Sequence, residues 1–287
     1  MNNALDVQGL RKSYHDFALD SVSFALPAGY IMGFVGKNGA GKTTTIRCIL
    51  NMAKRESGEI KVFGLDNMRD EQAVKQGMAA MFDDIFFVDT WRVKEVETAI
   101  KYFYEKWDSR LYAEYLKRFD LSPNKRVKEL SRGMKMKLML AVSMSHGAKL
   151  LILDEPTSGL DPVAREELLS ILKEYIADGE KSVFFSTHIT TDLERVADFI
   201  TLIDRGKVFY TGTKDGLLEH FCIVKGGESD LTDELKKKII GLSVTASGFK
   251  GMIRSGNIKG LPKDIITDSP SIDEILVHIS KGDAHYE

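Results

Sequence analysis

The sequence has few cysteines and no long apolar run. Its two cysteines, Cys48 and Cys222, lie far apart and match neither a metal-ligand spacing nor a disulfide framework. We therefore expect both to be reduced thiols in a reducing compartment. No stretch reaches the ~18 uninterrupted apolar residues that a membrane-spanning helix requires. The nearest candidate, 138–153, is interrupted by His146 and Lys149, so we expect a chain that does not cross a membrane by itself.

The sequence also lacks an excess of charge of either sign. It contains 40 Lys and Arg against 42 Asp and Glu, a formal net charge of −2. The summed charge therefore gives no reason to expect a nucleic-acid partner. The first ten residues lack the basic segment and apolar run of a secretory signal. With 287 residues, 43% of them hydrophobic and 29% charged, the composition is typical of a globular chain with room for one large and one small domain.

Strands that alternate with helices predict a parallel α/β core. Residues 4–35 have the pattern of three strands separated by turns, and a helical stretch follows, ending near Met52. Residues 150–153 are a continuous apolar run closed by acids, which is typical of a strand buried on both faces. A helix should follow from Asp161, because Pro162 occupies its first turn.

Two segments depart from this alternation. Residues of about 90–146 are rich in Lys, Glu, Tyr and Met in a helical pattern, and predict an all-helical insertion. After about Gly216 the pattern changes to short strand-like runs, a Lys-rich helix and a closing helix. We therefore predict a main domain at 1–216, with the helical insertion at about 90–146, and a small α+β accessory module at 217–287.

A glycine-rich stretch after the third predicted strand indicates nucleotide binding. Residues 36–43 read GKNGAGKT and match the P-loop pattern G-x-x-x-x-G-K-[ST]. Glycines let backbone N–H groups wrap phosphates at the positive end of a helix. In this motif we expect Lys42 to reach the β- and γ-phosphates of ATP, and the Thr43 hydroxyl to ligate Mg²⁺. The residues expected to contact ATP here are Gly36, Lys37, Asn38, Gly39, Ala40, Gly41, Lys42, Thr43 and Thr44.

The buried strand at 150–154 ends in two acids. Asp154 is expected beside Mg²⁺, through the water shell of the ion. Glu155 should point elsewhere, where it can polarise the attacking water as a general base. Two acids can also simply end a strand, but the P-loop upstream makes the catalytic interpretation the better one.

Four further features resemble one family. Residues 130–134, LSRGM, resemble the LSGGQ signature of ABC transporter ATPases. Residues 158–161 are similar to the D-loop of that family, His188 to its switch histidine, and Tyr14 to the aromatic residue that stacks on adenine. Each is weak alone, but together with the P-loop and the paired acids they follow one order over residues 5–215. The chain is identified as a member of the ABC transporter ATP-binding family, most like bacterial ABC-2 type exporters.

The resemblance implies a P-loop NTPase fold with an N-terminal antiparallel β-subdomain, and an ATPase coupled to transport. Two ATPase domains, as a homodimer or a heterodimer, would meet head to tail around ATP. Ser131 and Gly133 would then contact the γ-phosphate across the interface, and Asp161 of the D-loop would also belong to the ATP site. His188 would act on the P-loop side as a catalytic residue beside Glu155 and Lys42. A separate transmembrane permease is expected as partner, with the ATPase at the cytoplasmic face of the membrane as a peripheral protein.

Two positions depart from the family pattern. Asp83 stands where the family usually has Gln, and the resemblance implies that it is a Mg²⁺ ligand. Arg132 stands where Gly is commonest. The apolar cluster 85–91 next to Asp83 predicts either a docking surface for the permease or the core of the helical insertion, and the sequence does not decide between them.

Two readings of function remain at this stage. The first is an exporter ATPase with a peptide-like cargo, amphipathic or antimicrobial. The alternative is a regulatory or sensor module that uses ATP only to dimerise and has no role in transport.

Overall fold

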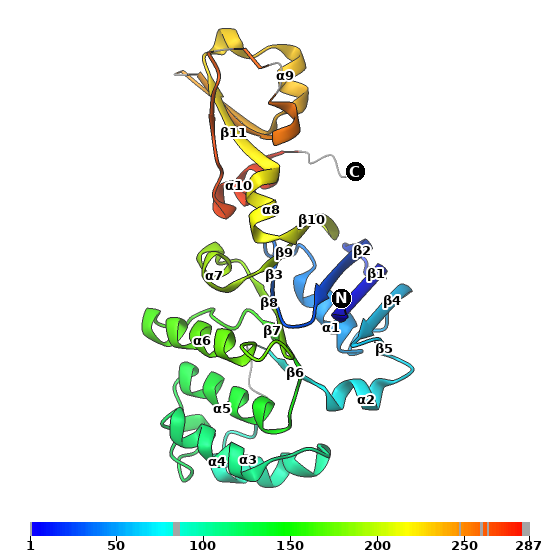
Figure 1. Ribbon diagram of the computed structural model, residues 1–287, viewed down its shortest axis with the longest axis vertical. Helices are drawn as coiled ribbons and strands as arrows, with labels where there is room; N and C mark the ends of the chain where they lie inside the picture. Colours follow the sequence, from blue (N-terminus) through cyan, green and yellow to red (C-terminus); the bar gives the residue numbers. More distant parts are fainter. Residues whose placement is uncertain (1, 83–86, 247, 259–260, 263, 283–287) are drawn as a thin grey trace.

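The computed structural model describes residues 2–82, 87–246, 248–258, 261–262 and 264–282. Its elements form three sheets, with helices packed around the central one (Figure 1). None of the described residues forms a helix both long and apolar enough to span a bilayer.

The central sheet has six strands in the order β10-β9-β3-β8-β7-β6. Their bounds are Ile31–Val35 (β3), Met78–Met81 (β6), Leu150–Asp154 (β7), Ser182–Thr187 (β8), Phe199–Asp204 (β9) and Lys207–Thr213 (β10). Neighbouring strands run parallel except β10, which is antiparallel to β9. Every residue of β3, β7 and β8 is buried; for β7 this confirms the prediction from its continuous apolar run. The parallel sheet places the carboxyl ends of β3, β7 and β8 at one edge.

An antiparallel sheet of order β2-β1-β4-β5 packs beside the P-loop helix. Its strands are Asn3–Ser13 (β1), Ala18–Pro27 (β2), Ser57–Val62 (β4) and Leu65–Asp66 (β5), and the helix α1 spans Lys42–Ile49. Phe24 of β2 lies 5.4 Å from Phe34 and 5.5 Å from Phe184 between ring centroids, which joins this sheet to the central one. Burial raises the pKa of the Cys48 thiol in α1, consistent with an unreactive core cysteine.

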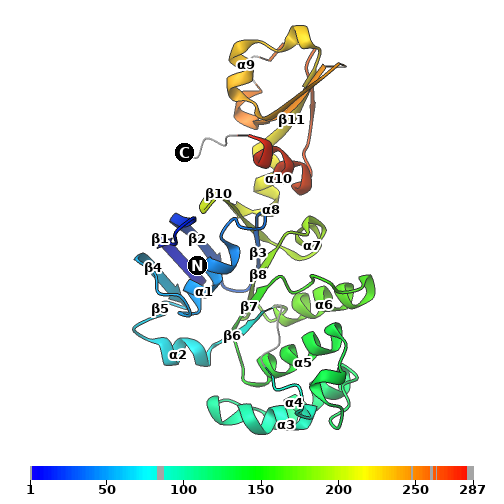
Figure 2. The same ribbon diagram turned by 180° about the vertical axis from the view of Figure 1, so that it is seen from behind.

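Further helices lie beside and below the central sheet (Figures 1 and 2). Their bounds are Glu71–Gln76 (α2), Val93–Ile100 (α3), Ser109–Arg118 (α4), Arg132–Ser145 (α5), Pro162–Tyr175 (α6) and Thr190–Val196 (α7). Short 3₁₀ turns lie at Lys101–Phe103 and Val127–Glu129. Asp161 caps α6 by accepting hydrogen bonds from the N–H groups of Val163 and Ala164, 3.0 Å each. The Pro162 start predicted from the sequence is therefore confirmed.

A third, antiparallel sheet lies at the end of the molecule opposite α3 and α4 (Figure 2). Its order is β12-β13-β11-β14, with bounds Phe221–Gly226 (β11), Ile240–Thr245 (β12), Gly248–Arg254 (β13) and Ile266–Asp268 (β14). The helices of this region are Lys214–His220 (α8), Asp233–Lys238 (α9) and Ile272–Lys281 (α10). Ile275 and Ile279 of α10 belong to the same buried cluster as Val35 and Leu202, so this sheet is anchored on the central one through α10.

Candidate active site

The P-loop encloses an open cavity of about 510 Å³ at the carboxyl edge of the central sheet. Its lining is Asp16, Phe17, Lys37, Asn38, Gly39, Gly41, Lys42, Thr43, Thr44 and Glu155. Gly41 has φ 113°, a conformation that favours glycine, and an added Cβ would lie 2.6 Å from Leu19 Cδ2 and 2.8 Å from Phe17 Cζ. Only glycine fits this position. Gly36 and Ala40 belong to the loop but not to the cavity lining.

The side chain of Lys42 turns back into the loop that precedes it. Only 6% of the residue is exposed. Its Nζ donates hydrogen bonds to the carbonyl oxygens of Gly36 (2.7 Å) and Lys37 (3.3 Å), and lies 3.3 Å from Glu155 Oε1. Three partners match the three donors of an ammonium group. The positive charge is thereby held at the mouth of helix α1, where phosphate is favoured.

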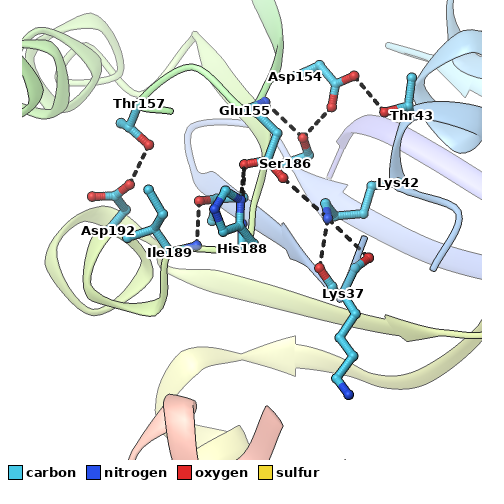
Figure 3. Close-up of polar contacts among 12 residues, drawn as sticks. Lys37, Lys42, Thr43, Asp154, Glu155, Thr157, Ser186, His188, Ile189 and Asp192 are labelled. Carbon is cyan, nitrogen blue, oxygen red and sulfur yellow. Dashed lines mark hydrogen bonds and ion pairs between the residues drawn. The ribbon is translucent and has the colours of Figure 1, made fainter. Parts of the chain in front are cut away.

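Asp154, the last residue of β7, connects the P-loop to the neighbouring strand β8. Thr43 Oγ1 donates to Asp154 Oδ2 at 2.9 Å, and Ser186 Oγ donates to Asp154 Oδ1 at 2.5 Å (Figure 3). Asp154 is 7% exposed, so its carboxylate needs these partners. The structure therefore brings together the two residues expected at Mg²⁺, Thr43 and Asp154. Asp83, expected as a further ligand, lies outside the described residues.

Glu155, the residue that follows β7, lines the cavity. It has φ 51°, an uncommon conformation for a non-glycine residue. Its Oε2 lies 2.7 Å from His188 Nδ1 and accepts from the His188 backbone N–H at 3.3 Å. With Lys42 on Oε1, the carboxylate lies between a cation and an imidazole (Figure 3). Such left-handed residues collect at functional sites, and here the turn separates the directions of Asp154 and Glu155.

A buried network behind the site was not predicted from the sequence. Asp192, fully buried in α7, accepts a hydrogen bond from Thr157 Oγ1 at 2.6 Å and one from Arg165 Nε at 2.5 Å (Figure 3 shows the Thr157 contact). Arg165 also donates to Thr191 Oγ1 at 2.6 Å. The network ties the segment after Glu155 to the helix after His188. In the sequence, the only sign of this network is a polar residue, Asp192, four positions after His188.

The signature residues do not reach this cavity. Ser131 caps α5 by accepting from the Met134 N–H at 3.3 Å, and Gly133 lies in the first turn of that helix. An added Cβ at Gly133 would lie 3.3 Å from Ala164 Cβ. The guanidinium of Arg132 lies over Gly159, where an added Cβ would lie 2.8 Å from Arg132 Nη1. Arg132, a departure from the family pattern, therefore packs on the segment similar to the D-loop.

Tyr14, expected to stack on adenine, is not among the residues that line the cavity. Its side chain is 51% exposed, and Lys12 Nζ lies 5.2 Å from its ring centroid. Phe17 lines the cavity instead. The hydrogen bond from the Tyr14 N–H to the Phe17 carbonyl, 2.7 Å, closes a tight turn that puts Phe17 on the P-loop side. Of these two aromatic residues, Phe17 is the one that lines the cavity beside the P-loop; the role of Tyr14 at adenine stays a prediction.

The apolar cluster at 85–91 is described only in part. Ile85 and Phe86 lie outside the described residues. Phe87 and Trp91 are half-buried and pack against the main core, whereas Val88 is 46% exposed. The described part thus contributes to the core, as one of the two sequence interpretations predicts, and leaves an exposed apolar residue beside it.

Comparisons with known proteins agree with this geometry. The family described as ABC transporter matches residues 19–158. The Nod factor export ATP-binding protein I of Rhizobium leguminosarum bv. viciae is 33% identical over 75% of this chain and 71% of its own length. The Bacillus subtilis ABC transporter ATP-binding protein YtrB is 30% identical over 72% and 70%. The Streptomyces coeruleorubidus daunorubicin resistance ATP-binding protein DrrA3 is 27% identical over 98% and 97%.

A solved structure described as the ATP binding subunit of an ABC transporter superimposes with a TM-score of 0.68 and 27% identity, over 75% of this chain and 91% of that one. The P-loop NTPase fold predicted from the sequence is therefore confirmed. The cavity geometry, the relatives and this structure lead to one assignment. The chain belongs to the ABC transporter ATP-binding proteins, ATPases coupled to transport.

Proposed function

We propose that ATP binds in the P-loop cavity with its phosphates at Lys42 and is hydrolysed there. The observation that carries the proposal is that the P-loop and Glu155, which follows β7, line one cavity, and that His188, which follows β8, contacts the Glu155 carboxylate. The loop amides and Lys42 hold the β- and γ-phosphates. Glu155 accepts the proton of the attacking water as general base, and His188 contacts the γ-phosphate beside it.

Thr43, which lines the cavity, and its partner Asp154 fit a Mg²⁺ ion. Thr43 Oγ1 and Asp154 Oδ2 are hard oxygen donors 2.9 Å apart, and Mg²⁺ is usually held by one or two carboxylates together with substrate phosphates and waters. Bound there, Mg²⁺ supplies charge neutralisation at the β- and γ-phosphate oxygens. Asp83 stays a predicted ligand.

We also propose that the working unit contains two ATPase domains, identical or not. Ser131, Gly133 and Asp161 lie outside the P-loop cavity of their own chain. Ser131 lies at the start of helix α5, and the N-terminus of a helix is suited to a phosphate. Ser131 can therefore complete an ATP site only on a second ATPase domain.

The coupled transport requires a permease, which we propose to be a separate transmembrane subunit that holds this chain at the cytoplasmic face of the membrane. The proposed docking surface is the 85–91 segment, on the support of exposed Val88. We propose the direction to be export, supported by relatives named for Nod factor export and daunorubicin resistance. The proposed cargo class, an amphipathic or antimicrobial peptide, rests on the resemblance to ABC-2 exporters alone.

The decisive experiment measures Mg²⁺-dependent release of phosphate from ATP by the purified chain. Sustained turnover that disappears on chelation of the metal supports the proposal. ATP binding with dimerisation but without phosphate release would favour the alternative, a regulatory module that uses ATP only to dimerise. The proposal of a separate permease is tested by co-purification of a tagged chain with a membrane protein from its own cells.

A further inference from the structure

Ser186 contacts both acids of the site although it does not line the cavity. It is fully buried in β8, in register with Asp154 of the neighbouring strand β7. Its Oγ lies 2.5 Å from Asp154 Oδ1 and 3.0 Å from the backbone nitrogen of Glu155 (Figure 3). One hydroxyl thus joins the residue expected at Mg²⁺ to the residue expected at the attacking water.

The direction of both hydrogen bonds is fixed by the chemistry of the partners. An ionised carboxylate only accepts and a backbone N–H only donates, whereas a serine hydroxyl donates one hydrogen bond and can accept up to two. The single proton of Ser186 therefore goes to Asp154, and a lone pair of Oγ accepts the N–H of Glu155. The hydroxyl thus donates one hydrogen bond and accepts another, and these two bonds fix its orientation.

For Asp154 the consequence is orientation. The last torsion of an aspartate side chain is soft, with a broad range of angles. With Oδ1 held by Ser186, Oδ2 is directed to Thr43 at the cavity. Without that hydroxyl, a buried carboxylate oxygen would lose a partner, which is costly for a charged group.

For Glu155 the consequence is that its backbone conformation is stabilised. Its left-handed φ of 51° is a strained conformation. The Glu155 N–H is shared between Ser186 Oγ at 3.0 Å and the Ser186 carbonyl oxygen at 3.2 Å. This turn aims the Glu155 carboxylate at Lys42 and His188.

We propose that Ser186 is a positioning residue for ATP hydrolysis. It orients Asp154 toward the metal-binding side of the cavity and holds Glu155 in the turn that aims its carboxylate, while it touches neither nucleotide nor metal. The inference rests on the proposed function, because it takes Asp154 as the metal carboxylate and Glu155 as the base.

The test compares Ser186→Ala with Ser182→Ala. Ser182 belongs to the same strand, is also fully buried, and its Oγ also accepts a backbone N–H, that of Gly29 at 2.9 Å. Both variants thus lose one buried hydroxyl and one hydrogen bond to backbone. Only Ser186 also contacts a carboxylate. A difference between the two variants therefore reports that contact and not a general loss of packing.

We expect Ser186→Ala to lower kcat by about tenfold or more and to raise the Mg²⁺ concentration at half-maximal activity, since outer partners of metal-binding groups have effects of this size. The affinity for ATP without metal should stay within about twofold of the parent, because Lys42 and the loop amides are unchanged. Ser182→Ala should keep the kcat and the Mg²⁺ dependence of the parent.

A second readout does not require activity. Mn²⁺ is added to the chain with ADP, and free Mn²⁺ is measured by electron paramagnetic resonance. Ser186→Ala should bind Mn²⁺ several-fold more weakly than the parent and Ser182→Ala, an effect expected of a lost outer partner. Ser186→Thr, which keeps the hydroxyl, should bind Mn²⁺ more tightly than Ser186→Ala.

Three results would overturn the proposal: equal kcat and Mg²⁺ dependence in the two alanine variants, unchanged Mn²⁺ binding in Ser186→Ala, or a threonine variant as impaired as alanine. A parent chain without ATPase activity would instead count against the proposed function. The Mn²⁺ measurement would still decide the role of Ser186 in that case, so the two failures are distinguishable.

Discussion

The Nζ of Lys42 lies 3.3 Å from Oε1 of Glu155, and both groups are largely shielded from water. One is the cation expected at the phosphates, and the other is the carboxylate expected at the attacking water. An ATP phosphate that reaches Lys42 therefore competes with Glu155 for the same ammonium group. We infer that nucleotide binding frees the carboxylate from this ion pair, so that the base becomes available when the substrate is in place.

We expect Lys42→Ala to weaken ATP binding by about 10-fold or more, as for the loss of a hydrogen bond to a charged group, and to abolish hydrolysis. Titration with ATP, followed calorimetrically, measures the affinity. The control is Lys37→Ala, because the Lys37 side chain points away from Glu155 (Figure 3) while its backbone stays in the loop; a smaller loss is expected. Parent-like affinity in Lys42→Ala would mean that the backbone amides supply most of the phosphate grip.

Glu155→Gln should lower the rate of hydrolysis by ~10²–10⁴, the usual effect of removing a well-placed general base. Glutamine cannot take up the proton, but it keeps the size of the side chain and a hydrogen bond to His188. ATP affinity should therefore persist, and ATP-bound dimers should accumulate, as size-exclusion chromatography with ATP would reveal. A variant that hydrolyses ATP at more than about a tenth of the parent rate, with chemistry limiting, would show that Glu155 is not the base.

The contiguous parts of the site could be predicted from the sequence. The two motifs are short contiguous stretches, residues 36–43 and the run that ends at Asp154. The strands that contain or precede them were predicted from their apolar patterns. The proximity of Asp154 to Thr43 in the P-loop follows from these motifs, because parallel strands end at one edge of the sheet.

The parts assembled from distant segments could not be predicted. Ser186 meets Asp154 only because β7 and β8 pair in register, and Asp192 meets Thr157 across 35 positions. The short helices α2, α7 and α8 have six or seven residues, too few for a clear helical periodicity. The side of the turn on which Phe17 lies depends on the hydrogen bond at Tyr14, which no pattern specifies.

Phe17→Ala should weaken ATP binding by about 1–3 kcal/mol, the usual value of a base–aromatic stack, and Tyr14→Ala by less. The reason is position, since Phe17 lines the cavity and Tyr14 is half-exposed beside Lys12. Tripolyphosphate, which lacks the base, is the control ligand, and its affinity should be unchanged in both variants. A larger loss of affinity for Tyr14→Ala would instead support Tyr14 as the residue that stacks on adenine, as the sequence resemblance implies.

The last prediction concerns His146, at the end of α5. The residue is 2% exposed, its ring stacks on Tyr104 at 3.8 Å between centroids, and burial lowers the pKa of its imidazole. The unfolded chain takes up a proton at this residue near pH 6.5, whereas the folded chain does so only at lower pH. The free energy of unfolding should therefore be unaffected by the titration of this residue above pH 6.5 and should decrease as the pH falls below 6.5.

His146→Phe keeps an aromatic ring against Tyr104 and removes the titrating group. Its free energy of unfolding should fall less between pH 7 and pH 5 than that of the parent, by up to about 1.4 kcal/mol for each pH unit over which the proton is taken up by the unfolded chain alone. Urea unfolding at pH 7, 6 and 5 measures this difference. His15→Phe, at an exposed position, is the matched control and should follow the parent. Burial also lowers the pKa of His278, so part of the pH dependence should persist in His146→Phe. An equal decrease in the free energy of unfolding of His146→Phe and the parent between pH 7 and pH 5 would contradict the prediction. It would mean that His146 takes up its proton in the folded chain as readily as in the unfolded one.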